Sequence, residues 1–118
     1  YQFATNPGGM TVRHYTTILL RNLMKNSEFK KTFVERVSYQ LKNVWNKKRI
    51  LAKYDELVAE LAPEIKRNHE RWGYSLTEYN TRLAELKKYI EKREGFMIKQ
   101  TVSFFNLNSK EKEKYFGD

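Results

Sequence analysis

Residues 26–45 read NSEFKKTFVERVSYQLKNVW, and the spacing of their apolar residues decides the fold. These apolar positions recur every three or four residues: Phe29, Phe33, Val37, Leu41 and Val44. This period puts the apolar side chains on one face of an α-helix, whereas a half-buried strand would need strict alternation. Asn26 and Ser27 can cap the amino end of the helix, and Glu28 suits its first turn. The stretch therefore predicts an amphipathic helix that starts after Asn26.

Residues 46–73 continue the helical pattern. Asn46 is a second capping residue, and one side of the following segment is apolar through Ile50, Leu51, Tyr54, Leu57, Val58 and Leu61. Pro63 lacks a backbone donor and clashes with the preceding turn, so we expect a kink or break near Leu61–Ala62. The helix should resume at Glu64 and end at Gly73 in a left-handed cap.

The chain outside these segments is helical by the same criteria. Ser75 and Glu78 have the spacing of a capping box, and the helix they open has a heptad-like seam at Tyr79, Leu83, Leu86 and Ile90. Gly95 is expected to interrupt this helix, and a last helix should follow over 96–107. Before residue 26, apolar residues over 11–25 predict a first helix.

Together these elements predict an all-α fold, an irregular antiparallel bundle of about five helices with a short extended N-terminal segment. We expect residues 1–10 to be the tail of a missing upstream region, because Asn6-Pro7-Gly8-Gly9 is a loop signal and the chain begins at Tyr1. Residues 11–107 form the helical domain in this interpretation. Residues 108–118 alternate in charge and are expected to be a charged tail that frays.

The composition narrows the class of protein. The chain has 118 residues, of which 40% are hydrophobic, and this is enough for one domain with a core. It contains no cysteine, which excludes disulfides and thiolate chemistry. No apolar stretch approaches the roughly 20 residues that cross a bilayer.

The net charge of +9 leaves two binding interpretations open. A stand-alone nucleic-acid-binding module would use clusters such as Trp45 beside Lys47, Lys48 and Arg49. Acidic residues interrupt most basic clusters, and no helix-turn-helix or RNA-binding signature occurs, so the pattern argues against a nucleic-acid partner. The other alternative is a protein-interaction module whose amphipathic helices form a homodimer.

Residues able to carry catalysis are scarce. The sequence has two aspartates, Asp55 inside a predicted helix and Asp118 at its end, and it has no glycine-rich phosphate loop. His14 and His69 are too few for a zinc set, and both are expected to be surface or hydrogen-bonded helix residues. We therefore predict no catalytic, cofactor-binding or metal-binding residue in this chain.

One cluster stands out on the segment before Gly73. Its members share helical spacing and are Glu60, Glu64, Arg67, Arg71 and Trp72. The simplest interpretation is a structural network of ion pairs, with Trp72 filling the core.

Three local patterns resemble the C-terminal helical portion of the spore coat protein H (CotH) kinase family, over about residues 11–107. The first is Asn26-x-x-Phe29 followed by Phe33 and Arg36. The second is Pro63-Glu64, Arg67 and Arg71-Trp72-Gly73, and the third is Arg93-Glu94-Gly95-Phe96, where Gly replaces the usual proline region.

The resemblance implies a bacterial atypical protein kinase that transfers phosphate from ATP, with Mg²⁺, to serines of coat or surface proteins. The nucleotide lysine and metal-binding aspartates of the family have no matching position here. The fragment itself is therefore expected to be inactive, without cofactor, and to support an upstream kinase lobe of the same chain. The cluster from Glu60 to Trp72 could then support the catalytic cleft. The resemblance also suggests a spore coat, exported or cell-surface location.

Overall fold

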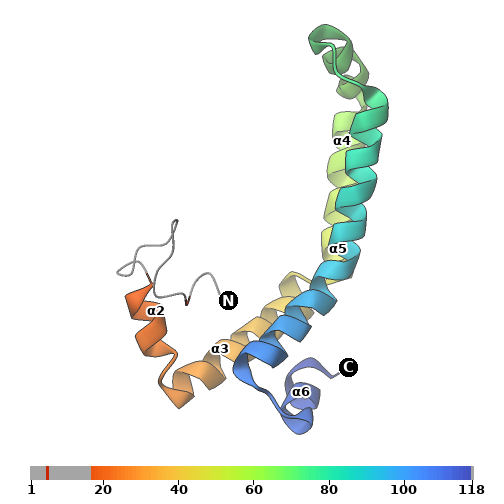
Figure 1. The fold of residues 1–118 in the computed structure, drawn as a ribbon. Helices are drawn as coiled ribbons and strands as arrows, with labels where there is room; N and C mark the ends of the chain where they lie inside the picture. The colour runs from red at the N-terminus through yellow and green to blue at the C-terminus, as the bar shows by residue number, and fades with distance from the viewer. Residues whose placement is uncertain (1–4, 6–16, 118) are drawn as a thin grey trace. The chain divides into compact units, whose positions relative to one another are not determined.

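The computed structural model describes residue 5 and residues 17–117, and within these residues it contains helices and no strand, which confirms the all-α prediction. Apart from residue 5, the predicted extended segment lies outside the described residues, and so do residues 11–16 of the first predicted helix, whose later part is helical over Ile18–Leu23. The elements, shown in Figure 1, are α2 (Ile18–Leu23), α3 (Ser27–Tyr39), the π-helical turn η2 (Gln40–Val44), α4 (Lys47–Trp72), α5 (Leu76–Phe105) and α6 (Ser109–Phe116).

The predicted helix ends are set by local hydrogen bonds. The side-chain oxygen of Asn26 accepts from the Phe29 amide at 2.9 Å, and that of Asn46 accepts from the Arg49 amide at 2.9 Å. Both oxygens satisfy amides that have no partner inside the helix, so both predicted caps are confirmed. Gly73 has the predicted left-handed conformation, with φ of 70°, and ends α4. At Ser75 one half of the predicted capping box is present, because Ser75 Oγ accepts from the Glu78 amide at 3.2 Å.

Of the kink or break predicted near Leu61–Ala62, the break is wrong, because α4 continues through Pro63 to Trp72. A proline inside a helix removes one backbone hydrogen bond and crowds the carbonyl four residues earlier. Here Pro63 is exposed, so water can satisfy that carbonyl, and long runs of helix on both sides hold the turn in place.

The predicted interruption at Gly95 is also wrong, since α5 runs through Gly95 to Phe105. Glycine costs a helix about 1 kcal/mol relative to alanine, and tertiary packing readily offsets a cost of this size. The two helices expected over 75–107 are thus one.

The charged end of the chain is helical instead of frayed. Asn108 caps α6 with a complete capping box, in which its side chain accepts from the Glu111 amide and the Glu111 carboxylate accepts from the Asn108 amide. The Ser38 hydroxyl on α3 donates to the carbonyl of Tyr115 on α6. This capping box and this tertiary bond order a segment whose alternating charges suggested a tail.

The helices divide into two compact units, one of residues 1–40 with 97–118 and one of residues 41–96. In the first unit, the centre lies between α3 and the end of α5. Val34 and Thr101 are buried there, and the rings of Phe33 and Phe105 are 5.6 Å apart. Thr101 is satisfied because its hydroxyl donates to the Met97 carbonyl at 2.8 Å.

The second unit is a helical hairpin. In it, α4 and α5 up to residue 96 run side by side in opposite directions (Figure 1). The Tyr54 hydroxyl of α4 donates to the Leu83 carbonyl of α5 at 2.9 Å, and Lys87 lies 3.1 Å from Asp55. At the other end, the Lys47 amide donates to the Glu94 carboxylate at 2.7 Å. These two hydrogen bonds and this ion pair set the register of α4 against α5.

Candidate functional site

The cluster singled out in the sequence lies on the distal half of α4. Glu64, Arg67 and Arg71 line a shallow hollow of ≈ 270 Å³, together with Leu61, Ile65 and Asn68. Arg67 Nη2 lies 3.0 Å from Glu64 Oε2, while the Arg71 guanidinium lies 5.4 Å from the centre of the Trp72 ring. Glu60 is exposed one turn before Glu64 and does not line the hollow.

The interpretation of Trp72 as core filling is wrong. The residue is 61% exposed, and the Arg71 guanidinium lies over its ring. The Glu64–Arg67 pair is exposed as well, and exposed ion pairs contribute at most about 1 kcal/mol. This part of α4 is therefore a charged and aromatic surface rather than a structural centre.

His69, near the tip of the hairpin, differs from its predicted environment. His69 is buried, and its ring packs at steep angles against Tyr74 and Tyr79, with ring centres 5.8 and 5.2 Å away. Its Nδ1 atom has no hydrogen-bond partner. The prediction of a surface or satisfied histidine is thus wrong for His69. His14 lies outside the described residues.

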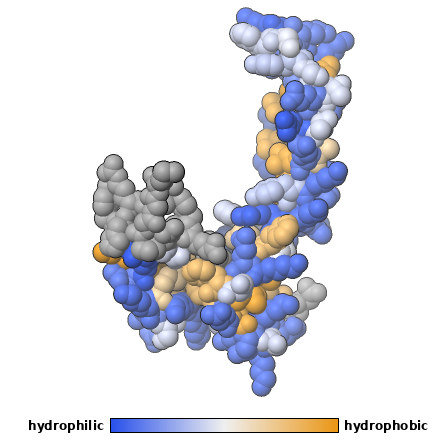
Figure 2. Space-filling view, viewed as in Figure 1, coloured by the Kyte–Doolittle hydropathy of each residue, from blue (hydrophilic) through white to orange (hydrophobic). Residues whose placement is uncertain are grey.

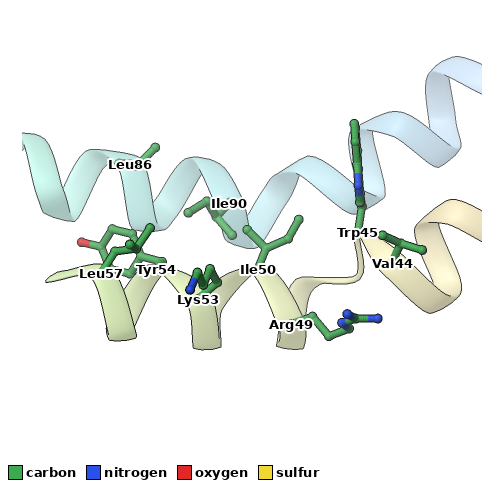
Figure 3. A pocket seen from close by; sticks show the side chains of 9 residues that line it. All are labelled: Val44, Trp45, Arg49, Ile50, Lys53, Tyr54, Leu57, Leu86 and Ile90. Carbon is green, nitrogen blue, oxygen red and sulfur yellow. The ribbon is translucent and has the colours of Figure 1, made fainter. Parts of the chain in front are cut away.

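The second unit also has a hollow that sequence reasoning missed. It has a volume of ≈ 530 Å³ and lies between α4 and α5 (Figure 3). Its lining comprises Val44, Trp45, Arg49, Ile50, Lys53, Tyr54, Leu57, Leu86 and Ile90. Figure 3 shows Trp45 standing at one end beside α5, while Arg49 extends away from α5. We call this hollow the hairpin groove.

The hairpin groove is apolar along its floor and basic along one edge. Trp45 is 65% exposed, and Leu57 and Leu86 are nearly half exposed. Arg49 and Lys53 form the edge. A signal for this groove exists in the sequence, because the apolar residues over 50–61 span more of the helix than one partner helix can cover.

Several cations on the hairpin form ion pairs with neighbouring carboxylates. The hydrogen bond and the charge of Glu56 raise the pKa of Lys53, and its Nζ lies 2.6 Å from Glu56 Oε1. Asp55 raises the pKa of Lys87 in the same way, first through a hydrogen bond and then through its charge. Glu85 and then Glu78 raise the pKa of Arg82. These pairs are exposed, and they orient side chains more than they stabilise the fold.

The hairpin has few groups that could hold a metal ion. Asp55, the aspartate that the structure describes, is held by Lys87, and Asp118 lies outside the described residues. Within residue 5 and residues 17–117, no three His, Asp or Glu side chains gather in a way that could hold a metal ion. In the same part of the chain, none of the helices has both the length and the apolar character needed to span a membrane.

A second hollow lies in the first unit, with a volume of ≈ 280 Å³. Its apolar floor is formed by Val34, Phe105 and Leu107, and Lys30 and Lys31 stand at its edge. Glu111, which also lines it, is engaged in the capping box of α6.

Comparison with known proteins gives one match. No curated protein and no solved structure matches the chain. A protein-family model does match, and it covers residues 4–97, whereas the resemblance was expected to extend to about residue 107. The matched range includes the whole hairpin and the α3 segment that carries the first sequence pattern. Since it covers most of the chain, this match shows that the chain belongs to the CotH kinase protein family.

Proposed function

We propose that this chain is the helical C-terminal subdomain of a CotH-type protein kinase and supports a catalytic lobe that lies upstream. In this proposal the complete kinase transfers phosphate from ATP to serine residues of coat or surface proteins. The observation that carries it is the match of the CotH kinase family model over residues 4–97.

The residues present do not fit MgATP. Kinases hold Mg²⁺ through carboxylate oxygens and the nucleotide phosphates, with a lysine near the phosphates. On the hairpin, Asp55 is paired with Lys87 at 3.1 Å, and Glu64 with Arg67 at 3.0 Å. Both carboxylates lie on exposed helix surfaces, and each is already paired with a lysine or arginine side chain. We therefore derive no step of phosphoryl transfer from these residues.

Within the proposal, the α4 surface around Arg71 is the part that contacts the catalytic lobe. Arg71 stacks on Trp72, and a guanidinium held over an aromatic ring still presents its N–H groups at the edge. Such a group can hydrogen-bond a loop carbonyl or a phosphate of the neighbouring lobe. Trp72 is 61% exposed, so the catalytic lobe could bury its side chain on contact.

The first test is the coding DNA upstream of Tyr1. We expect it to encode a lobe with a nucleotide-binding lysine and metal-binding aspartates. A start codon directly before Tyr1 would overturn the proposal, since no catalytic lobe would then exist for the helices to support.

A second test uses calorimetry on residues 1–118. We expect no heat of MgATP binding at micromolar concentration, and we expect binding when the upstream lobe is included. Micromolar binding by the 118 residues alone would contradict the proposed division of roles.

A further inference from the structure

We propose that the exposed face of α4 from Arg49 to Glu64 is a self-association surface, on which two copies of the hairpin pack antiparallel through α4 to form a four-helix bundle. This proposal does not depend on the kinase assignment. It rests on the geometry of one helix face and on the order of charges along it.

The first observation is that the two hollows of the hairpin lie along the same face of α4. Successive helical residues are turned by about 100°, so positions three, four and seven apart share a face. The α4 residues that line the two hollows keep this spacing from end to end: Arg49, Ile50, Lys53, Tyr54, Leu57, Leu61, Glu64, Ile65, Arg67, Asn68 and Arg71. They form one continuous face with Leu57 near its middle.

The second observation is that the apolar residues in the middle of this face are uncovered. Leu57 and Leu61 are 45% and 54% exposed, and Leu86 of α5 is 47% exposed beside them. The half-buried Val58 and the buried His69 lie farther round α4, towards α5. Figure 2 shows apolar surface along the hairpin, set among hydrophilic side chains. Two helices cannot cover a stripe of this width, whereas a four-helix arrangement can.

The third observation selects a second copy as the occupant. Along the face, the amino-terminal part of α4 is basic, with Arg49 and Lys53, and the central part is acidic, with Glu60 and Glu64. With Leu57 of each copy at the two-fold axis, Lys53 lies next to Glu60 of the second copy. Arg49 then lies next to Glu64 of the second copy. Because the symmetry repeats both pairs, four opposite-charge contacts flank the apolar centre.

The same geometry closes the groove. A two-fold axis at Leu57 leaves each α5 on the same side of the two α4 helices, so Leu86 and Ile90 of each copy face the interior. The side chains of Leu57 and Leu61 then enter the hairpin groove of the second copy, next to Tyr54 and Ile50. In the single copy, Lys53 pairs with Glu56 and Glu64 pairs with Arg67, both within α4. Because these ion pairs are exposed and weak, replacing them by pairs to the second copy costs little free energy.

The test is sedimentation equilibrium of residues 1–118 from micromolar to several hundred micromolar concentration. We expect the mass to rise with concentration from 14.2 kDa to twice that value. A mass that stays at 14.2 kDa throughout would overturn the proposal and leave the groove to a different protein partner.

Variants identify the face. Leu57→Glu places two carboxylates at the axis and should weaken the dimer by about 30-fold or more, the loss typical of a central contact residue. Ala59→Glu is the matched control, because it adds the same charge on the opposite side of α4 and should leave the dimer unchanged. A dimer that survives Leu57→Glu would show that another surface associates.

A charge exchange tests the antiparallel register. Lys53→Glu and Glu60→Lys should each weaken the dimer, while the double variant should restore it. Circular dichroism on each variant separates loss of association from loss of folding. If the double variant is as weak as the single variants, the two side chains do not pair across the interface and the proposed register is wrong.

Discussion

At the scale of single residues, two glycines with different backbone conformations are informative. Gly73 ends α4 with φ of 70°, and Gly95 lies inside α5. An added Cβ would meet no atom within 4 Å at either position, so only backbone conformation distinguishes them.

This gives a prediction of opposite signs for one substitution. Gly73→Ala should destabilise the chain by about 1 kcal/mol, because an L-residue in the left-handed region is strained. Gly95→Ala should stabilise it by about 0.5–1 kcal/mol, because it removes backbone entropy from the unfolded chain. Urea unfolding followed by circular dichroism measures both, and equal signs would refute the assigned backbone.

His69 is the second informative residue. Its buried Nδ1 has no partner, and an unsatisfied buried polar atom costs about 1–3 kcal/mol. His69→Phe removes that atom and keeps a ring against Tyr74 and Tyr79. We expect the variant to be more stable by about 1 kcal/mol. A less stable variant would mean that the imidazole makes a hydrogen bond in solution, and His69→Gln, which keeps polar groups at the site, would then be the better substitute.

At the scale of elements, α4 carries a proline that sequence rules would place at a helix boundary. Pro63→Ala should restore a donor to the Ala59 carbonyl and remove the ring clash, raising stability by about 1–3 kcal/mol. Helical content should change little, because α4 already continues through this position. A large gain in circular dichroism at 222 nm would instead indicate that the helix is broken in solution. Ala62→Ser provides a control at the neighbouring exposed position.

At the scale of the whole molecule, large hydrophobic residues remain exposed. Among the described residues, Val34 and Leu41 are the buried hydrophobic ones, while Trp45, Leu61, Tyr89 and others are more than half exposed. Since stability comes mainly from apolar burial, we expect the monomer to be only marginally stable.

Association should therefore appear in thermal unfolding. If two copies pack through α4, the midpoint temperature must rise with protein concentration, because binding stabilises only the folded state. Leu57→Glu should abolish this dependence, and Ala59→Glu should not. Scans of the wild-type chain across a hundredfold range of concentration measure the effect, and a constant midpoint would argue against association.

The sequence determined much of the local structure. Helical periodicity, the caps at Asn26 and Asn46, and the left-handed end at Gly73 depend on interactions within a few residues, and all are confirmed. The three local patterns that suggested the family also occupy short contiguous stretches, and all of them lie within residues 4–97, which the family model matches.

The tertiary structure decided what depends on long-range packing. Local rules predicted interruptions at Pro63 and Gly95, but each costs only a few kcal/mol or less and continuous helices accommodate both. A capping box and a bond from Ser38 to Tyr115 ordered the charged end. The periodicity of the sequence did not predict which side chains are exposed. Trp72 is exposed, His69 is buried, and the hairpin groove lies beside Leu57. Spacing determines which side chains share a helix face, whereas only the neighbouring helix determines which part of that face is covered.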